Sequence, residues 1–557
     1  MRSRITQVLA LGLAIVALVA LAAFPLGVLF VRSFSRDGQL SIDNYIQVFA
    51  EPLNYLPLWN TLQLGLWTVL LAAGIGVPLA WLVARTDLPG RWIIENLSLL
   101  PYMVPPFIGA IAWVQLLAPR VGYVNRLWTS LVGATNPLFN IYSFGGMVWV
   151  MGIYSFPFVF IAVRGALERM NPSLEEAARI AGARRLQVLR DVTIPLVVPS
   201  IASGMMLAFL YTVANFGIPA LLGMRARIPV LTTRIYTYVH RGDFTGIQLA
   251  AALSVLLMGL AVVLLLANQL LLRKQHGAAI ISGKSVRPTL VELGPWKHVA
   301  AVGVYLFMGL AIIAPLVALV LTSFLKAWGL PLTWQNFTIR NYLYILFDYS
   351  LTKSAILNSL SLALITATLA VVLGSFLAYI SAKTRLRGRK LVDILCTLPN
   401  AIPGTVVALA MILAWSGQFG INIYNTFAIL VVAYVAHYTF YAFRNTSASL
   451  VQIHSSLEEA ARVSGAGWFQ NLRDVVVPLI RPGLVAGWLL VFMPALRELN
   501  ISILLYGPRT PTIGVAVFEL QDAGYYHIAA ALGSVVVAVV FVINLIMRRI
   551  VGGRGTV

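Results

Sequence analysis

One polar stretch occurs twice in this chain of 557 residues, and everything around it is strongly apolar. The first copy, residues 174–195, reads LEEAARIAGARRLQVLRDVTIP, and the second copy, residues 457–478, reads LEEAARVSGAGWFQNLRDVVVP. Matching positions are separated by the same 283 residues (458 minus 175). We call these segments the first and the second repeated loop. A polar segment present in two copies indicates two equivalent contacts with something in the aqueous phase.

The rest of the composition predicts a membrane protein, because 59% of the residues are hydrophobic and only 11% are charged. In soluble domains about a quarter of all residues are charged. Runs of about 20 apolar residues, long enough to cross ~30 Å of hydrocarbon as a helix, recur along the chain. They lie near 7–31, 58–84, 94–117, 144–165, 196–222, 248–271, 299–323, 354–381, 392–415, 426–444, 479–505 and 527–547. The sequence therefore predicts an all-α polytopic membrane protein with about 12 transmembrane helices.

The duplication extends beyond the polar stretch. A second set of residues matches at an offset of 298 (358 minus 60). These pairs are Asn60 and Asn358, Thr86 and Thr384, Gly90 and Gly388, Arg91 and Arg389, Glu95 and Asp393, Pro101 and Pro399, and Pro105 and Pro403. The first copy thus has 15 extra residues (298 minus 283), which fit in the loop 118–143. Six helices per copy is an even number, so we expect two parallel six-helix repeats.

We divide the chain into a first repeat, 1–272, a cytoplasmic linker, 273–298, and a second repeat, 299–557. The linker contains Gly283-Lys284-Ser285, but it lacks the glycine spacing of a phosphate-binding loop, so we expect no nucleotide site there. The only cysteine, Cys396, is expected to be a small buried apolar residue.

The net charge of +21 reflects membrane topology and not nucleic-acid binding. Lys and Arg gather in the short segments expected on one side, which is the positive-inside pattern. Arg2 and Arg4 precede an apolar run too long for a cleavable signal, so this run is expected to be a signal-anchor. We therefore expect a multi-pass membrane protein with cytoplasmic N- and C-termini, the lipid bilayer around it, and no nucleic-acid partner.

Each repeated loop is expected to hold two short helices. Ser173 with Glu176, and Ser456 with Glu459, have the spacing of a capping box at the first helix. Glycines are expected to end that helix, an Arg-Asp pair lies in the second one, and a proline marks the turn back into the membrane. An amphipathic helix resting on lipid headgroups is the alternative, but such helices favour Lys and Arg over an acidic start.

The pattern Glu176-Ala177-Ala178…Gly182…Ile194-Pro195, with its second copy from Glu459 to Pro478, resembles the EAA loop of ABC importer permeases. The resemblance covers essentially the whole chain. The chain is similar to the iron(III)-type permeases of that family, with two permease copies fused in one polypeptide. In that family the loop forms a coupling helix seated in a cleft of an ATPase subunit. The ATPase-coupling residues implied are Glu175, Glu176, Ala177, Ala178, Gly182, Arg190, Asp191, Pro195, Glu458, Glu459, Ala460, Ala461, Gly465, Arg473, Asp474 and Pro478.

The resemblance also implies a location in the bacterial inner (cytoplasmic) membrane, the partners and the activity. Two copies of a cytoplasmic ABC ATPase would use ATP and Mg, and an extracytoplasmic solute-binding protein would deliver the cargo. The chain itself is expected to have no cofactor, no metal site and no catalytic residue, and not to be an enzyme. The expected cargo is ferric iron, with thiamine, phosphonates such as 2-aminoethylphosphonate, and polyamines as alternatives. A major-facilitator-type secondary transporter is the rival class, because it also has twelve spans in parallel repeats.

Polar residues inside spans are costly and usually functional, and three of them are candidates for the translocation pathway. Arg497 and Glu498 fall in the eleventh predicted span, and Asn215 matches Glu498 in the fifth. The alternative is that Arg497 snorkels outward or pairs locally with Glu498.

Other intramembrane features are assigned structural roles. Glu95 and Asp393 are expected to pair with basic loops. Prolines should bend the third and ninth spans. These prolines are Pro101, Pro105, Pro106, Pro399 and Pro403. Tyr and His residues cluster near 236–240 and 525–527, and they fit an aromatic interface belt better than a metal site.

Overall fold

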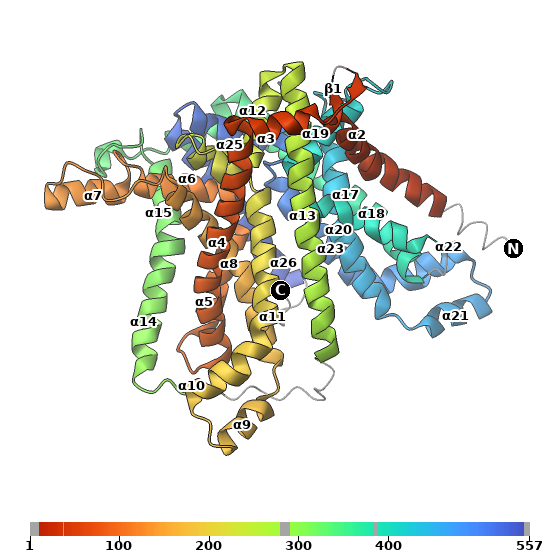
Figure 1. Ribbon diagram of the computed structural model, residues 1–557, viewed down its shortest axis with the longest axis horizontal. Coiled ribbons are helices and arrows are strands. Elements are labelled where there is room, and N and C mark those ends of the chain that lie inside the picture. The colour runs from red at the N-terminus through yellow and green to blue at the C-terminus, as the bar shows by residue number, and fades with distance from the viewer. Residues whose placement is uncertain (1–10, 37, 279–289, 384–387, 551–557) are drawn as a thin grey trace.

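The computed structural model describes residues 11–36, 38–278, 290–383 and 388–550, and it is almost entirely helical. Figure 1 shows long helices side by side, with short helices at both ends of the bundle. The linker segment Gly283-Lys284-Ser285, Arg2, Arg4 and Thr384 lie outside the described residues.

The elements of the first half are η1 (Val19–Ala23), α2 (Phe24–Ser33), β1 (Ser35–Arg36), β2 (Gln39–Leu40), α3 (Asp43–Ala50), α4 (Pro52–Arg85), α5 (Arg91–Met103), α6 (Pro106–Leu117), α7 (Tyr123–Val132), α8 (Phe144–Arg169), α9 (Pro172–Ile180), α10 (Arg185–Val188), η2 (Leu189–Thr193), α11 (Ile194–Ala214), η3 (Pro219–Gly223), α12 (Leu231–Arg241) and α13 (Phe244–Ala278). The two strands pair antiparallel, with Ser35 opposite Leu40.

The elements of the second half are α14 (Trp296–Met308), η5 (Gly309–Ile313), α15 (Ala314–Ser323), η6 (Trp334–Asn336), α16 (Arg340–Leu343), η7 (Tyr344–Asp348), α17 (Ser350–Lys383), α18 (Arg389–Ala401), α19 (Gly404–Trp415), α20 (Phe427–Val451), α21 (Ser455–Val463), α22 (Trp468–Asn471), η8 (Leu472–Val476), α23 (Val477–Leu496), α24 (Ser502–Leu505), α25 (Ile513–Asp522) and α26 (Tyr526–Ile550). The long helices follow the same order as in the first half, and α7 has no counterpart among them. This extra helix lies in the loop 118–143, where the 15 additional residues were expected.

Ten helices among the described residues are long and apolar enough to cross a membrane, and the number rises to 12 if each of two bent pairs is one span. The predicted count of about 12 is therefore confirmed. The third and ninth spans are not single helices: α5 and α6 meet at 104°, and α18 and α19 meet at 110°. The break follows from proline, which lacks an N–H and forces the preceding residue out of the helical region. Val104 before Pro105 and Ile402 before Pro403 are both extended, with ψ of 131° and 135°.

Four of the long helices contain a one-turn π-bulge just before a proline. The bulges are η1, η2, η5 and η8, and the prolines that follow are Pro25, Pro195, Pro315 and Pro478. In η2, for example, the N–H of Ile194 reaches back five residues to the carbonyl of Leu189. A proline has no N–H to bond the residue four positions back, so the wider turn lets the helix continue through it.

Glycine sets the closest helix crossings. A Cβ on Gly76 of α4 would lie 3.0 Å from the Phe156 carbonyl oxygen of α8, and one on Gly374 of α17 would lie 2.8 Å from the Phe443 nitrogen of α20. The two glycines are equivalent, 298 residues apart (374 minus 76). Small residues allow backbones in a membrane bundle to approach this closely. The second and fourth spans of each half are therefore packed backbone to backbone.

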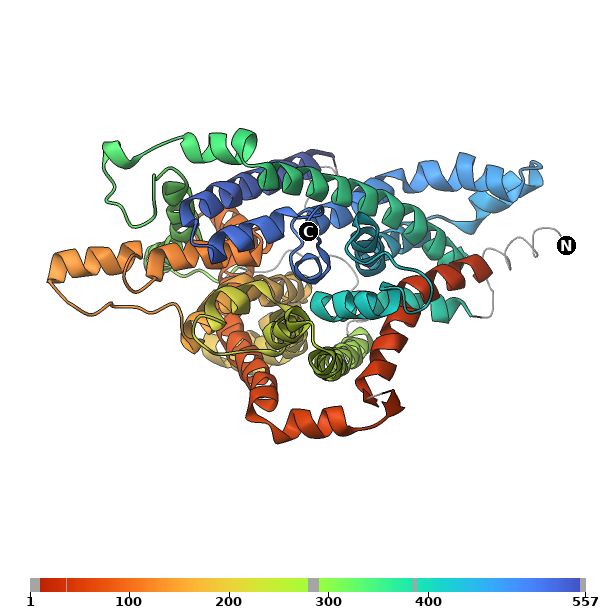
Figure 2. The ribbon, with the colours of Figure 1, turned by 90° about the horizontal axis from the view of Figure 1, so that it is seen from above.

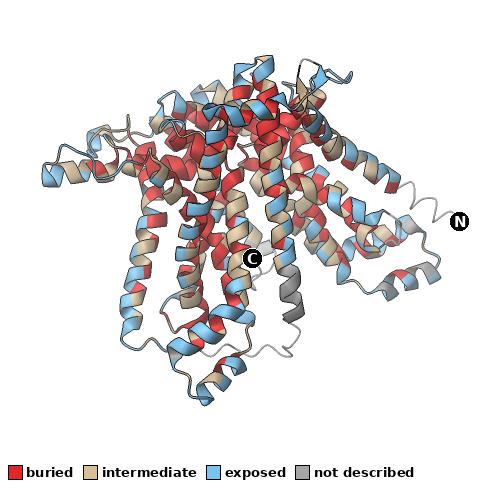
Figure 3. Ribbon diagram, in the orientation of Figure 1, coloured by how far each residue is buried: buried red, intermediate tan, exposed pale blue. Residues whose placement is uncertain are grey.

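The first span of each half packs against the other half. The red ribbon of α2 lies beside the teal ribbon of α19 (Figure 2), η1 contacts α18, and α15 contacts α6. The last part of the linker also joins the halves, since the Val291 amide donates to the Arg85 carbonyl (2.7 Å) and the Leu293 amide to the Asp87 carboxylate (2.9 Å). The two repeats are thus interlocked. Buried residues gather in the upper part of the molecule as drawn in Figure 3, and the lower helix ends are largely exposed.

Candidate functional site

The two repeated loops lie at the same end of the bundle, far apart from one another, as α9–α10 and α21–α22 in Figure 1. Each folds as a short helix, a tight turn and a second short helix that runs directly into a span. Gly182 and Gly465 end the first helix with φ of 89° and 90°, a left-handed conformation that glycine adopts without strain. The Ala183 amide bonds the Ala178 carbonyl, as Ala466 does with Ala461. The predicted helix ends at these glycines are confirmed.

The helix starts differ from the prediction. The capping box at Ser173 and Glu176 does not form, because α9 begins at Pro172 and the Asn171 side chain accepts the Ser173 amide (3.1 Å). In the second loop His454 accepts the Ser456 amide (3.3 Å), so the box expected there is wrong as well. Both loops are capped two residues earlier than expected, by Asn171 and His454, which lie between the preceding helix and the first helix of the loop.

The prolines also act differently. Pro195 and Pro478 do not mark the turn back towards the membrane, because α10–η2–α11 and α22–η8–α23 are continuous helices, Leu186–Ala214 and Phe469–Leu496. The chain turns at the glycines instead. Consequently the second short helix of each loop is the rigid end of the fifth or eleventh span.

The first glutamate of the first loop is buried and not available to a partner. The Glu175 carboxylate pairs with the guanidinium of Arg85, which is 1% exposed at the end of α4, and it accepts a hydrogen bond from the Thr193 hydroxyl (2.7 Å). Glu175 thus ties α9 to the second span and to the start of the fifth. We call this set the first anchor.

The second loop has an equivalent anchor built from different donors. Glu458 accepts from Lys383 at the end of α17 (2.9 Å), and Lys383 matches Arg85 at the offset of 298 (383 minus 85). The Tyr379 hydroxyl and the Asn471 amide lie 3.4 Å from the same carboxylate. Lys383 is 14% exposed and also donates to the Ile453 carbonyl (3.0 Å). The carboxylate of the second anchor is therefore shared among more donors than that of the first, and its basic partner is more exposed to solvent.

The other faces of both loops are exposed and apolar at the same positions. Ile180 and its match Val463 are each 89% exposed, Leu186 and Phe469 are also exposed, and so are Leu174 and Leu457. Every candidate coupling residue falls in the same exposure class as its match. The exposed ones are Glu176, Ala177, Gly182, Arg190, Asp191, Pro195, Glu459, Ala460, Gly465, Arg473, Asp474 and Pro478, the half-buried ones are Ala178 and Ala461, and the buried ones are Glu175 and Glu458. Two matched apolar surfaces thus project from rigid supports.

The π-bulges η2 and η8 each carry an exposed charge pair. Arg190 and Asp191 form an ion pair of 2.7 Å, and Arg473 and Asp474 form one of 3.8 Å. The hydrogen bond from Arg190 lowers the pKa of the Asp191 carboxyl, so this side chain is ionised at neutral pH.

The three pathway candidates fall within the predicted fifth and eleventh spans, 196–222 and 479–505, but they lie just beyond the ends of the helices that the structure shows there. α11 ends at Ala214 and α23 at Leu496. Asn215 and Glu498 act as equivalent caps: the Asn215 side chain accepts the Ile218 amide (3.1 Å), and Glu498 accepts those of Ile501 and Ser502 (2.8 and 3.0 Å). Their matched positions therefore have a structural cause, the tight turn that follows each helix.

Arg497 neither snorkels outward nor pairs with Glu498. Its Nη1 donates to the carbonyls of Met103 and Tyr102, which are the C-terminal end of α5 in the first half. A cation at a helix C-terminus is favourable, because the last carbonyls have no partner in the helix. Arg497 thus bonds the second half to the broken span of the first.

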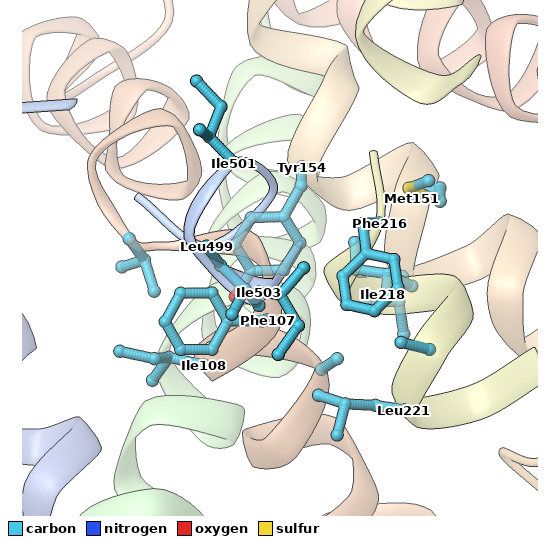
Figure 4. Packing of buried hydrophobic residues seen from close by; sticks show 14 of the residues in the cluster. Phe107, Ile108, Met151, Tyr154, Phe216, Ile218, Leu221, Leu499, Ile501 and Ile503 are labelled. Carbon is cyan, nitrogen blue, oxygen red and sulfur yellow. The ribbon is translucent and has the colours of Figure 1, made fainter. Parts of the chain in front are cut away.

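The turns after α11 and α23 meet at the centre of the molecule. The Phe216 amide donates to the Asn500 side chain (3.1 Å), which joins the two halves. Figure 4 shows Phe107 and Phe216 of the first half beside Leu499 and Ile503 of the second, all of them buried. We call this apolar junction the central closure.

The sequence analysis did not identify a set of side-chain hydrogen bonds that is present in both halves, which we call the polar staples. Asn60 donates to the Pro229 carbonyl, and Asn358 to that of Pro511. The neighbouring hydroxyls of Thr61 and Ser359 accept the amides of Leu231 and Ile513. These staples hold the segments that follow the central closure, and the repeated Asn at the offset of 298 was the available signal.

A second missed set holds the ends of the first spans. Asn44 donates to the carbonyls of Ser33 and Ser35, and Asn341 to those of Ser323 and Leu325. A Tyr hydroxyl bonds a Ser hydroxyl in both halves, Tyr45 with Ser33 and Tyr342 with Ser323. The repeated Ser-Phe followed by Asn-Tyr in the sequence was the signal here.

Two smaller predictions change. Glu95 pairs with Arg164 of α8, and Asp393 accepts from Ser381 of α17 (2.9 Å), so both partners lie on helices and not on basic loops.

The Tyr236 and His240 rings lie 4.0 Å apart. Cys396 is buried as predicted. Among the described residues, no group of three His, Cys, Asp or Glu could hold a metal.

Comparison with known proteins gives consistent matches. The family model described as binding-protein-dependent transport system inner membrane component matches residues 76–275 and 370–553, once in each half. The ferric transport system permease protein FbpB of Actinobacillus pleuropneumoniae is 25% identical over 95% of this chain and 76% of its own. The Fe(3+)-transport system permease protein FbpB 2 of Haemophilus influenzae is 26% identical over 91% of this chain and 92% of its own.

Shorter matches cover one half. A putative 2-aminoethylphosphonate transport system permease protein, PhnV of Salmonella paratyphi A, is 28% identical over 42% of this chain and 88% of its own. A solved bacterial ABC transporter involved in alginate import has a chain with a TM-score of 0.37 and 20% identity, which covers 45% of this chain and 94% of that one.

Proposed function

The chain belongs to the family of binding-protein-dependent transport system inner membrane components, as a fused two-copy permease, and we propose that it couples ATP hydrolysis on two partner subunits to the import of ferric iron. In this proposal the repeated loops face the cytoplasm, with both termini on that side of a bacterial inner membrane. A solute-binding protein meets the opposite face. The secondary-transporter alternative is set aside by the family match.

The observation that carries the proposal is the pair of matched apolar surfaces. Six large apolar side chains, three on each loop, are exposed to water at positions 283 apart. An exposed apolar patch rimmed by charges is typical of a protein–protein contact. Since the copies agree in exposure at every candidate coupling residue, we infer two identical partners, one ATPase subunit on each loop. Lipid headgroups are a poorer match, because both patches begin with acidic residues.

The anchors explain how a movement of the partners reaches the spans. Glu175 connects α9 to α4 and η2, and Glu458 connects α21 to α17 and α22. Because the second short helix is continuous with α11 or α23, each loop cannot shift without its second and fifth spans. When ATP draws the two ATPases together, the loop ends of both halves would approach and the central closure would open.

The relatives named for ferric transport support iron as the cargo. They cover nearly the whole chain, as both halves in one polypeptide, whereas the phosphonate permeases cover one half. Phosphonate is the second candidate cargo.

A co-purification experiment tests the docking. Ile180→Asp with Val463→Asp places a charge at the centre of each apolar surface, so the ATPase subunits should be lost from the detergent-solubilised complex and ATP-driven uptake should stop. Trp334→Asp is the matched control, because Trp334 is 92% exposed on the opposite side of the molecule. Retention of the ATPases by the double variant, with normal uptake, would refute the docking.

A further inference from the structure

Part of the Arg497 guanidinium makes no hydrogen bond to the described residues. Both of its hydrogen bonds, to the carbonyls of Tyr102 and Met103, use Nη1. The guanidinium carries five N–H groups, so those on Nε and Nη2 have no partner within the part of the chain that the structure describes. Arg497 is only half-buried, and Tyr102 beside it is 47% exposed. The free edge of this cation is therefore open to a ligand.

Three tyrosines lie near Arg497. Tyr102 and Tyr211 both pack on Phe158, with ring centroids 5.7 and 5.1 Å apart, and Tyr441 comes from α20 of the other half. Tyr211 and Tyr441 are both close enough to Arg497 to respond to its charge. The group thus combines the third and fifth spans of one half with the fourth and fifth spans of the other.

The hydroxyls of Tyr211 and Tyr441 are also unused. Neither has a hydrogen-bond partner among the described residues, and neither oxygen is one of the sealed, unpartnered polar atoms found there. Both rings are half-buried, so the hydroxyls face space that a small molecule can reach. Unused donors at such a place are uncommon, since interior polar groups normally have partners.

These donors define the ligand chemistry. A guanidinium edge suits two oxygens of a carboxylate, phosphate or phosphonate, and phenol O–H groups donate to the same oxygens. A bare cation would be repelled by Arg497. The carboxylate of Glu498, the nearest acidic group, is buried and already accepts the amides of Ile501 and Ser502 and the Ser502 hydroxyl. Its charge is thus met by donors on its own turn.

We propose that Arg497, Tyr102, Tyr211 and Tyr441 form an oxyanion site on the loop side of the central closure, where cargo is held in transit through its anionic oxygens. The role in transport rests on the proposed function. A ferric cargo would cross here as a complex with an oxyanion, and a phosphonate cargo would bind directly. Arg497 has no counterpart in the first half, where Ala214 stands at the matched position, so the site is single and asymmetric.

Titration calorimetry on the full chain in nanodiscs, with no ATPase or binding protein present, tests the site. The probes are inorganic phosphate, 2-aminoethylphosphonate, citrate and ferric citrate. Tyr211→Phe with Tyr441→Phe removes two hydroxyls and keeps the ring packing, so the affinity for the bound probe should fall roughly tenfold. Arg497→Gln should lower it by about ten- to a hundredfold, and Arg497→Lys should restore part of it. Tyr424→Phe, in an outer loop, is the matched control and should bind like wild type.

The relative affinities of the four probes distinguish the possible cargoes. Tighter binding of ferric citrate than of citrate assigns the site to an iron-carrying anion, and tightest binding of 2-aminoethylphosphonate assigns it to a phosphonate. The proposal is overturned if wild type binds none of the probes, or if the double Phe variant binds them as tightly as wild type with an unchanged melting temperature. Because no ATPase is present, neither result bears on docking at the repeated loops.

Discussion

The first anchor should matter more than the second, and the difference can be measured. The change is Glu175→Gln in one variant and Glu458→Gln in another. Each substitution keeps the shape of the side chain and removes the charge that its basic partner needs. Arg85 is almost fully buried and has no other hydrogen-bond acceptor among the described residues, whereas Lys383 keeps the Ile453 carbonyl and some contact with water.

The magnitudes follow from this contrast. Removing one partner of a buried ion pair costs about 3–5 kcal/mol, because the other charge stays buried and unpaired. Loss of a hydrogen bond to a charged group that retains other partners costs about 1.5–3 kcal/mol. Glu175→Gln should therefore raise the detached population of α9 by roughly a hundred- to five-thousandfold, and Glu458→Gln should raise that of α21 by about ten- to a hundredfold.

Hydrogen–deuterium exchange reports the detachment, and reconstituted vesicles report its effect. Amides of α9 should lose protection in Glu175→Gln, ATP hydrolysis should continue, and uptake per ATP should fall. Arg85→Met with Glu175→Leu should recover much of the coupling, because apolar pairs of similar size often replace buried ion pairs at little cost. Unchanged exchange of α9 in Glu175→Gln, or greater damage from Glu458→Gln, would refute the reasoning.

Other predictions address the scaffold. Gly76→Val and Gly374→Val should each destabilise the fold by about 1–3 kcal/mol through overpacking, which a lower melting temperature would show. Gly74→Val should be tolerated, because nothing lies within 4 Å of a Cβ built at that position. Equal effects at all three sites would contradict the close helix crossing. Asn358→Ala should speed exchange in the segment before α25, since its bonds to the Arg509 and Pro511 carbonyls would be lost; unchanged exchange would show that the staple is dispensable.

The architecture could be read from the sequence because it depends on hydrophobic length and on internal matching. Apolar runs located the spans, and the change in offset located α7 before any helix was known. The breaks at Pro105 and Pro403 were expected only as bends. A proline pattern shows that a helix is interrupted, but the angle depends on what packs on each side, here the turns after α11 and α23.

The candidate site was predicted in outline, and the roles of its residues were not. The identical EE pairs suggested that both glutamates face a partner, yet Glu175 and Glu458 turn inward to Arg85 and Lys383. That pairing joins residues 90 positions apart in the first half (175 minus 85), and no local pattern reveals it. Arg497 was singled out because it is charged within an apolar run, but its acceptors are carbonyls nearly 400 residues away.

Thiol labelling tests most directly whether the repeated loops are twin cytoplasmic contact surfaces for a motor. Ile180→Cys and Val463→Cys introduce accessible thiols into a chain whose only native cysteine is buried. A membrane-impermeant maleimide should label both positions in inside-out vesicles and neither in right-side-out vesicles, and added ATPase subunits should protect both. Labelling from the outer side, or labelling that the ATPase leaves unchanged, would contradict the account.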